Sequence, residues 1–418
     1  MRTITYALSL IFIFMLPWEG AVNFPGLGGK ASNTIAGLMG LGLAAFWFAT
    51  VVITGRLRKP GPIHMIFFLF VVWNAVSAFW STNPARAVAH ARTWAQLLVM
   101  TLILWDLYTT RTAVLAGLQA YVLGAYVAFG SAAANYLSGK VFYTYYDRFS
   151  SGDTNPDGFG FILALGLPIA WHLAASARAD QNAPLLKLVN YAYIPVALLG
   201  ISLSGTRTAL IAAIPAMAFG LASLTHLRLW TRITMFLFLT SAILILLPYV
   251  QTLRSFERFS TIGTELTQGD LNNRTNNWRE GLATFTERPL AGIGSGMYRS
   301  QNSLGKVAHN SYISVLVELG LIGFLLFGII LTIAVAQAWS HPSRWDKSFW
   351  LSLLLVWAIG ASTLTWEYRK TTWLFLILIV ASAALTRYRD GAVELIQRHK
   401  SVGQFVRQAK MNELPQGE

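Results

Sequence analysis

The amino-acid sequence predicts an all-α integral membrane protein of about 12 transmembrane helices, with one large loop that contains an amphipathic helix. Composition is the first reason: of the 418 residues, 55% are hydrophobic and only 12% are charged, about half the charged share of a soluble domain. Distribution is the second, because the apolar residues gather into long runs and give a mean hydropathy of +0.50. The third is one long hydrophilic stretch, residues 251–308.

Most of the apolar runs reach, or nearly reach, the ~20 residues with which a helix crosses ~30 Å of hydrocarbon. A helix is expected because it satisfies its own backbone hydrogen bonds where water is absent. The predicted spans are 3–17, 34–53, 65–79, 95–105, 113–130, 158–175, 188–202, 208–224, 233–250, 312–338, 348–366 and 371–386. The chain therefore divides into residues 1–250 with the first nine spans, the loop 251–308, residues 309–386 with the last three spans, and a basic tail, 387–418.

An even number of spans places both termini on one side. Lys and Arg are more frequent in the short loops on that side, which predicts cytoplasmic termini and places the loop 251–308 on the opposite side. The formal net charge of +14 is spread over short loops, so the predicted partners are anionic membrane lipids and no nucleic acid. A site for an anionic substrate is the alternative. The absence of cysteine excludes disulfides, a thiol nucleophile and a thiolate metal site.

Two arginines occupy positions that a helix dipole disfavours. Arg207 closes the hairpin 204–207 between two spans, and Arg274 heads the apolar stripe of a helix that carries Trp278 and Leu282. A cation in a first turn is opposed by the dipole, whereas an anion is favoured there. The two arginines therefore indicate a missing anionic partner, and pyrophosphate fits.

Each arginine also has a structural interpretation. Arg207 at a membrane interface is able to extend to lipid phosphates. Arg274 is able to form a salt bridge to Glu257 or Glu265 within the same loop.

Of the seven histidines, only His90 and His309 face the side of the long loop in this topology. His309 stands where the loop re-enters the membrane. A histidine at an interface more often caps a helix, but beside two arginines it becomes a candidate general base.

Glu318 lies nine residues after His309, about 180° around a helix, so the two residues do not form an acid–base pair. Gly320 and Gly323 indicate close helix packing, with Glu318 bonded to a neighbour; all three are predicted to be structural. The run 292–296, with three alternate glycines, predicts a flexible turn. The acidic residues opposite the termini form no paired motif, so no metal site is predicted.

Two motifs carry a family resemblance. The first is Trp278-Arg279-Glu280-Gly281, followed by Pro289-Leu290-x-Gly292-x-Gly294-x-Gly296, and the second is His309-Asn310-Ser311-Tyr312-x5-Glu318-x-Gly320-x-x-Gly323. Supporting segments are Ser204-Gly205-Thr206-Arg207, Trp80-Ser81-x-x-Pro84 and Asn155-Pro156-Asp157. With these motifs the chain resembles the O-antigen ligase/polymerase family of bacterial envelope glycosyltransferases. The family more often has Asn where Asp157 stands.

The resemblance implies a multi-pass enzyme of the bacterial inner membrane whose active site faces the periplasm. It implies an inverting transfer of O-antigen glycan from undecaprenyl pyrophosphate to a hydroxyl of lipid A–core oligosaccharide, without metal or cofactor, in lipopolysaccharide biosynthesis. His309 is expected to activate the acceptor hydroxyl, while Arg207 and Arg274 hold the pyrophosphate. Further substrate contacts are predicted for Arg148, Trp278, Asn310 and Tyr312.

Three alternatives stay open. An O-antigen polymerase and a protein O-oligosaccharyltransferase of the same family share this chemistry, and the single dominant loop favours the ligase. Outside the family, a lipid or solute transporter is the alternative. It predicts internal repeats, broken helices and charges near the membrane midplane.

Overall fold

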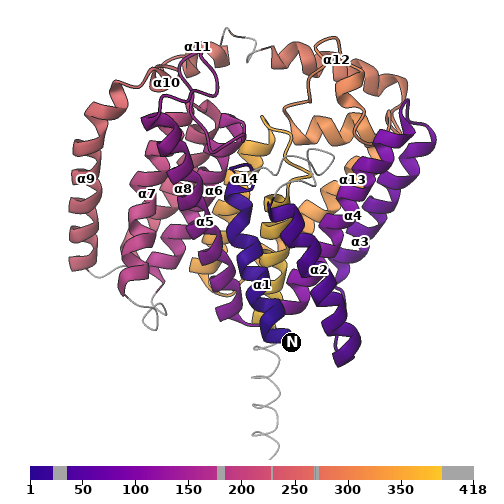
Figure 1. The fold of residues 1–418 in the computed structure, drawn as a ribbon, viewed down its shortest axis with the longest axis horizontal. Helices are drawn as coiled ribbons and strands as arrows, with labels where there is room; N and C mark the ends of the chain where they lie inside the picture. The colour runs from indigo at the N-terminus through magenta and orange to yellow at the C-terminus, as the bar shows by residue number, and fades with distance from the viewer. Residues whose placement is uncertain (22–34, 177–183, 227–228, 268, 270–272, 388–418) are drawn as a thin grey trace, which may run out of the picture.

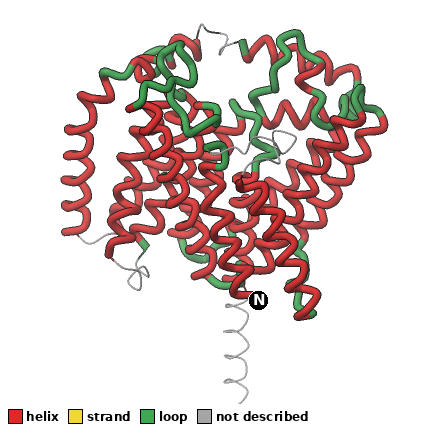
Figure 2. The backbone as a smooth tube through the Cα atoms, viewed as in Figure 1, coloured by secondary structure: helices red, strands yellow, loops and turns green. Residues whose placement is uncertain are grey.

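The computed structural model describes residues 1–21, 35–176, 184–226, 229–267, 269 and 273–387. Over these residues the chain is a bundle of helices without a β-strand (Figure 2); the only ladder-like pairing among them is an isolated bridge between Tyr143 and Arg148. The all-α prediction is therefore confirmed. The predicted tail lies outside the described residues, apart from Arg387.

Each of the predicted apolar runs overlaps a helix, and the run 348–366 continues past the end of α14 at Ala361. The bundle helices are α1 (Arg2–Met15), α2 (Ile35–Thr54), α3 (Pro62–Val76), α4 (Pro84–Leu107), α5 (Arg111–Leu137), α6 (Pro156–Ala175), α7 (Pro184–Ser204), α8 (Arg207–Ser223), α9 (Leu229–Gln251), α13 (Ser311–Trp339), α14 (Arg344–Ala361) and the last described helix, Lys370–Arg387. Nine helices of the described residues are long and apolar enough to cross a membrane, and Arg2–Trp18 and Arg207–Ser223 are shorter apolar helices.

Helix α6 forms the centre of the bundle. It contacts α5, α7, α8 and α14, and 89% of its apolar window is buried inside the protein. Helix α9 is the opposite case: it stands at the edge of the bundle beside α7 (Figure 1), with 11% of its window buried. An apolar helix with so little protein contact presents its surface to lipid.

The helix starts that matter for the site are fixed by local sequence. Asn155 caps α6, because its carboxamide oxygen accepts the N–H of Asp157 at 2.8 Å, and Pro156 at the first position lacks the N–H that would go unbonded there. Asn310 caps α13 and accepts the N–H groups of Tyr312 and Ile313. These caps place Asp157 and His309 at the same end of the bundle.

The predicted long loop forms short helices at that end: α10 (Arg254–Glu257), α11 (Ile262–Thr267) and α12 (Arg274–Glu287). Figure 1 shows them at the end of the bundle opposite to the N-terminus, and we call this end the loop end. Helix α12 is the predicted amphipathic helix, with Asn277 and Gly281 buried on one face and Arg279 exposed.

Helix α13 is interrupted at Gly320, whose φ of 66° and ψ of −168° are not helical. The interruption frees backbone groups, and the loop segment 289–294 bonds to them. The N–H of Gly294 donates to Glu318 O at 2.8 Å, and the N–H of Leu321 donates to Pro289 O at 2.8 Å. The indole of Trp73 on α3 donates to Leu319 O at 2.9 Å. The protein's own chain therefore fills the break, as membrane-embedded irregular backbone requires.

This break changes the interpretation of the glycines. The sequence predicted that Gly320 allows close helix packing. In the structure Gly320 instead allows the break in α13. The predicted flexible turn at 292–296 is instead a largely buried segment in which Gly292, Gly294 and Gly296 all have positive φ. An added Cβ at Gly323 would contact Leu319 of its own helix.

Replacement of Gly320 by alanine is expected to cost at least about 2 kcal/mol of folding free energy. A Cβ there would meet Leu290 O and would lie 2.6 Å from Ala291 N, in a backbone conformation that L-residues avoid. The matched control is Gly328→Ala on the same helix, where a Cβ meets no atom within 4 Å. Thermal unfolding in detergent should show a clear fall in Tm for Gly320→Ala only, and equal Tm values for the two variants would contradict this account of the break.

Candidate functional site at the loop end

Arg207 is held at the start of α8 by two groups of the long loop. Its guanidinium forms an ion pair with Glu265 Oε1 at 3.0 Å and donates to Thr261 Oγ1 at 3.0 Å. Its side chain is 15% exposed. Glu265 therefore pairs with Arg207. The alternative prediction, a salt bridge between Glu265 and Arg274, is not what the structure shows. A half-buried ion pair in the first turn keeps Arg207 in place against the helix dipole.

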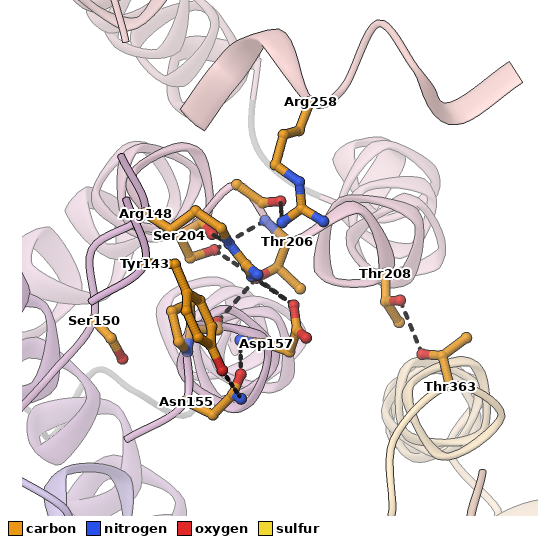
Figure 3. A network of polar contacts seen from close by, with 12 residues as sticks. Tyr143, Arg148, Ser150, Asn155, Asp157, Ser204, Thr206, Thr208, Arg258 and Thr363 are labelled. Carbon is orange, nitrogen blue, oxygen red and sulfur yellow. Dashed lines mark hydrogen bonds and ion pairs between the residues drawn. The ribbon is translucent and has the colours of Figure 1, made fainter. Parts of the chain in front are cut away.

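Arg148 lies in a network of polar contacts that joins the loop before α6 to the hairpin before α8 (Figure 3). Its guanidinium is buried, donates to Ser204 O at 2.7 Å and to Thr206 Oγ1 at 3.2 Å, and forms an ion pair with Asp157 Oδ1 at 2.6 Å. The ring of Tyr143 lies 5.6 Å from the guanidinium carbon. Arg148 thus uses its Nε and Nη2 groups within the protein and joins both backbone segments.

Arg274 begins α12 and comes to the other oxygen of the same carboxylate. The distance from its Nη2 to Asp157 Oδ2 is 3.8 Å, beyond hydrogen-bond length. Burial lowers the pKa of Arg274, and the positive charges of Arg207 and Arg148 act in the same direction. Asn273 before it has a left-handed backbone, with φ of 67°. Arg274 is therefore held near an anionic group without being saturated by it.

Arg258 is a fourth guanidinium in this cluster, contributed by the residue that follows α10. It is buried and donates to Gly205 O at 3.0 Å. Burial and the charge of Arg148 lower the pKa of Arg258 to about 10, while Asp157 opposes this shift. The four arginines, Arg148, Arg207, Arg258 and Arg274, face the carboxylates of Asp157 and Glu265. Among the described residues the cluster carries a surplus of two positive charges.

His309 lies within the electrostatic reach of two members of this cluster, Arg274 and Asp157. Burial lowers the pKa of His309 to about 4; the charge of Arg274 adds to the shift, and Asp157 opposes it. Its imidazole is therefore neutral at pH 7 and able to accept a proton. The sequence had indicated an imidazole that titrates near neutrality, and the buried, cationic surroundings explain the difference.

The backbone of His309 is strained, with φ of 50°. Its N–H donates to Thr365 Oγ1 at 2.9 Å, in the connection between α14 and the last described helix. Ser311 Oγ donates to Leu364 O in the same connection. Glu367 of this connection is buried, which raises its pKa to about 8, so that this carboxyl is protonated at neutral pH. Residues 364–367 thus hold the turn that carries His309.

Helix α12 is bonded to the chain just before His309. The Nδ2 of Asn277 donates to Val307 O at 2.9 Å, and the Nε1 of Trp278 donates to Ala308 O at 2.8 Å. Trp278, predicted to contact substrate, therefore uses its indole N–H to set the position of α12 relative to His309. Arg274 on the same helix is positioned by the same bonds.

The remaining predicted residues have structural contacts. Asn310 uses its carboxamide oxygen to cap α13, and the Tyr312 hydroxyl lies 3.4 Å from Ala358 O. Glu318 accepts the backbone N–H groups of Gly296 at 2.6 Å and Tyr298 at 3.1 Å. These bonds attach the long loop to α13, which is the structural role that the sequence predicted for Glu318.

His90, the other histidine that was predicted to face the side of the long loop, belongs to a separate network. Its Nδ1 lies 2.8 Å from Ser295 Oγ, and this hydroxyl donates to Asn74 Oδ1 at 2.7 Å. No group of three or more His, Asp or Glu within the described ranges is arranged to hold a metal ion.

Sequence reasoning had not singled out Asp157, Arg258 or Glu265 as members of the site. A signal was present for Asp157, because it stands in a first helical turn directly after a cap and where relatives of the resembled family more often have Asn. No sequence pattern indicated Arg258, because α10 is only one turn long and is too short to show a helical periodicity. The placement of Arg258 depends on how α10 packs on the hairpin 204–207.

Fold and site together define a class: a multi-pass helical membrane protein with an electropositive cluster and a neutral histidine at one end. Residues 192–328 match the family model described as O-Antigen ligase, and this segment contains Arg207, Arg258, Arg274 and His309. The chain is also 24% identical over 289 residues to the Exopolysaccharide production protein ExoQ of Rhizobium meliloti (strain 1021). That alignment covers 65% of this chain and 64% of the relative, slightly less than two thirds of its length.

These likenesses support membership of the chain in the O-antigen ligase family. The resemblance that the sequence motifs indicated is confirmed.

Proposed function

We propose that the chain is an inverting glycosyltransferase that moves a glycan from undecaprenyl pyrophosphate to an acceptor hydroxyl. The observation that carries the proposal is the surplus of positive charge next to a neutral imidazole. Arg207 pairs with Glu265 and Arg274 approaches Asp157 at the loop end, and His309 is within the electrostatic reach of Arg274 and Asp157. A leaving pyrophosphate and a hydroxyl that must lose a proton need these two kinds of group.

In the proposed reaction the acceptor oxygen attacks the anomeric carbon of the donor. The imidazole of His309 takes the hydroxyl proton as the new C–O bond forms. The bond between the anomeric carbon and the pyrophosphate oxygen breaks with its electron pair, and Arg207 and Arg274 stabilise the charge that develops there. One displacement inverts the anomeric centre and leaves no glycosyl-enzyme.

Lipid A–core is the acceptor that we propose, in a bacterial inner membrane with the loop end facing the periplasm and the termini in the cytoplasm. The single long loop supports a ligase. A polymerase that extends a second glycan chain is the second candidate, and the similarity to a protein named for exopolysaccharide production favours it. The transporter alternative loses its best support, because the break in α13 is filled by residues 289–294 of the same chain.

A transfer assay with purified protein tests the function. Undecaprenyl-pyrophosphate-linked glycan is supplied together with lipid A–core, in excess EDTA because the proposal assigns the pyrophosphate charge to arginines. We expect glycan-modified lipid A–core and released undecaprenyl pyrophosphate. Product on a second glycan chain would establish the polymerase, and product on a polypeptide the oligosaccharyltransferase. Lipid or solute transport without any product would reject a transferase, and turnover that needs added Mg²⁺ would reject the metal-independent mechanism.

A further inference from the structure

Arg258 has a mostly buried side chain at the loop end, and Asp157 acts on it only at a distance. Its residue surface is 8% exposed, and Nη1 donates to Gly205 O at 3.0 Å. Among the residues that the structure describes, no carboxylate lies within ion-pair distance of its guanidinium, and Gly205 O is the one protein acceptor of its side chain. Buried charges in proteins are normally paired and hydrogen-bonded, because leaving water is costly. The Nε and Nη2 nitrogens of Arg258 are not among the fully buried polar atoms that lack a partner, so these donors stay open to solvent or to a ligand.

The position of Arg258 is set by contacts between α10 and the hairpin before α8. Ser255 Oγ on α10 donates to Ser202 O at 2.7 Å, which fastens α10 to the end of α7. The approach is so close that a Cβ on Gly205, where φ is 58°, would lie 2.8 Å from Ser255 O. Figure 3 shows the Arg258 side chain extending from this segment toward Thr206 and Arg148. The fold therefore holds a further cation against three others.

The net positive charge of the cluster indicates the charge of the ligand that would neutralise it. The surplus of two positive charges equals the charge of a pyrophosphate that carries a substituent on each phosphate, one ionised oxygen on each. Arg148 already has an ion-pair partner in Asp157, and its Nε and Nη2 groups are bonded to Ser204, Asp157 and Thr206. If Arg207 and Arg274 alone held the donor, Arg258 would stay without an ion-pair partner among the described residues after the donor had bound.

We propose that Arg258 is a third phosphate-binding residue, which contacts the pyrophosphate of the lipid-linked donor together with Arg207 and Arg274. This inference rests on the proposed function. It adds Arg258, the residue that directly follows α10, to the phosphate-binding site. Three guanidinium groups on two phosphates allow recognition of the second phosphate, so the site distinguishes a pyrophosphate-linked lipid from a monophosphate-linked one.

The test compares binding of undecaprenyl pyrophosphate and undecaprenyl phosphate to the full chain in detergent. Arg258→Gln should weaken binding of the pyrophosphate lipid on the order of 10-fold or more, with a smaller effect on the monophosphate lipid. The control is Arg254→Gln, four residues earlier at the start of α10, an exposed arginine paired with Asp147 at 3.2 Å, which should bind as the native chain does. Arg258→Lys keeps the charge and should lie between the two.

The outcomes separate the inference from the proposed function. Native protein that shows no preference for the pyrophosphate lipid would count against the proposed function itself. Native preference that Arg258→Gln leaves unchanged, or an equal loss for both lipids, would overturn the role of Arg258 alone. If Arg258→Gln does not fold, as shown by gel filtration and Tm, the folded Arg258→Lys variant decides by its ratio of affinities.

Discussion

Replacement of His309 by asparagine is expected to lower kcat by about 100- to 10,000-fold while the protein stays folded. The imidazole is the group that accepts the hydroxyl proton in the proposed reaction, and a carboxamide does not accept one at neutral pH. Asparagine is the informative replacement because the backbone of His309 is left-handed, with φ of 50°, and asparagine tolerates that conformation. His309→Gly tolerates it as well and serves as the second variant.

The measurement is initial rate in the transfer assay, with Tm recorded for each variant. Both variants should keep the native Tm to within a few degrees, since Thr365 still accepts the backbone N–H. Full activity of either folded variant would exclude His309 as the base.

The acid side of the pH profile adds a second signature to this experiment. Because the neutral imidazole is the active form, and its pKa is lowered to about 4, kcat/KM should stay constant down to about pH 5 and fall as the pH passes through 4. A bound pyrophosphate offsets the charge of Arg274, which contributes to that lowering. The acid limb of kcat should therefore lie at higher pH than that of kcat/KM.

Replacement of Arg274 by lysine is expected to reduce kcat/KM on the order of 100-fold. Arg274 lies 3.8 Å from Asp157 and keeps donors for a ligand, and an ammonium group does not reproduce a guanidinium that bonds two phosphate oxygens at once. Arg274→Gln should be weaker still, because it removes the charge. The same steady-state assay, with donor concentration varied, measures both.

The matched control is Arg279→Gln, five residues later on α12. Arg279 is exposed and donates to Asn276 Oδ1 at 3.1 Å, so its loss should leave the rate unchanged. Equal activity of native protein and Arg274→Lys would mean that Arg274 is no phosphate ligand. A similar loss for Arg279→Gln would indicate a general effect of positive charge on α12.

Much of the site followed from local rules. Arg207 and Arg274 attracted attention because a cation in a first helical turn is unfavourable by itself, and the structure places both beside carboxylates. The partners were not predictable, because Asp157 and Glu265 come from other segments. Trp278 illustrates the same limit: its place on the apolar face of α12 was evident, but its bond to Ala308 O depends on the path of the returning chain.

The sequence by itself determined the all-helical membrane fold, since a long apolar run in hydrocarbon has to satisfy its backbone within a helix. It also determined which histidine and which two arginines to examine, and the family motifs. Only the tertiary structure decided that α13 breaks at Gly320, that α10 brings Arg258 to Gly205 O, and that His309 is neutral among cations. These features arise from contacts between residues distant in sequence, whose burial and mutual charge no local pattern encodes.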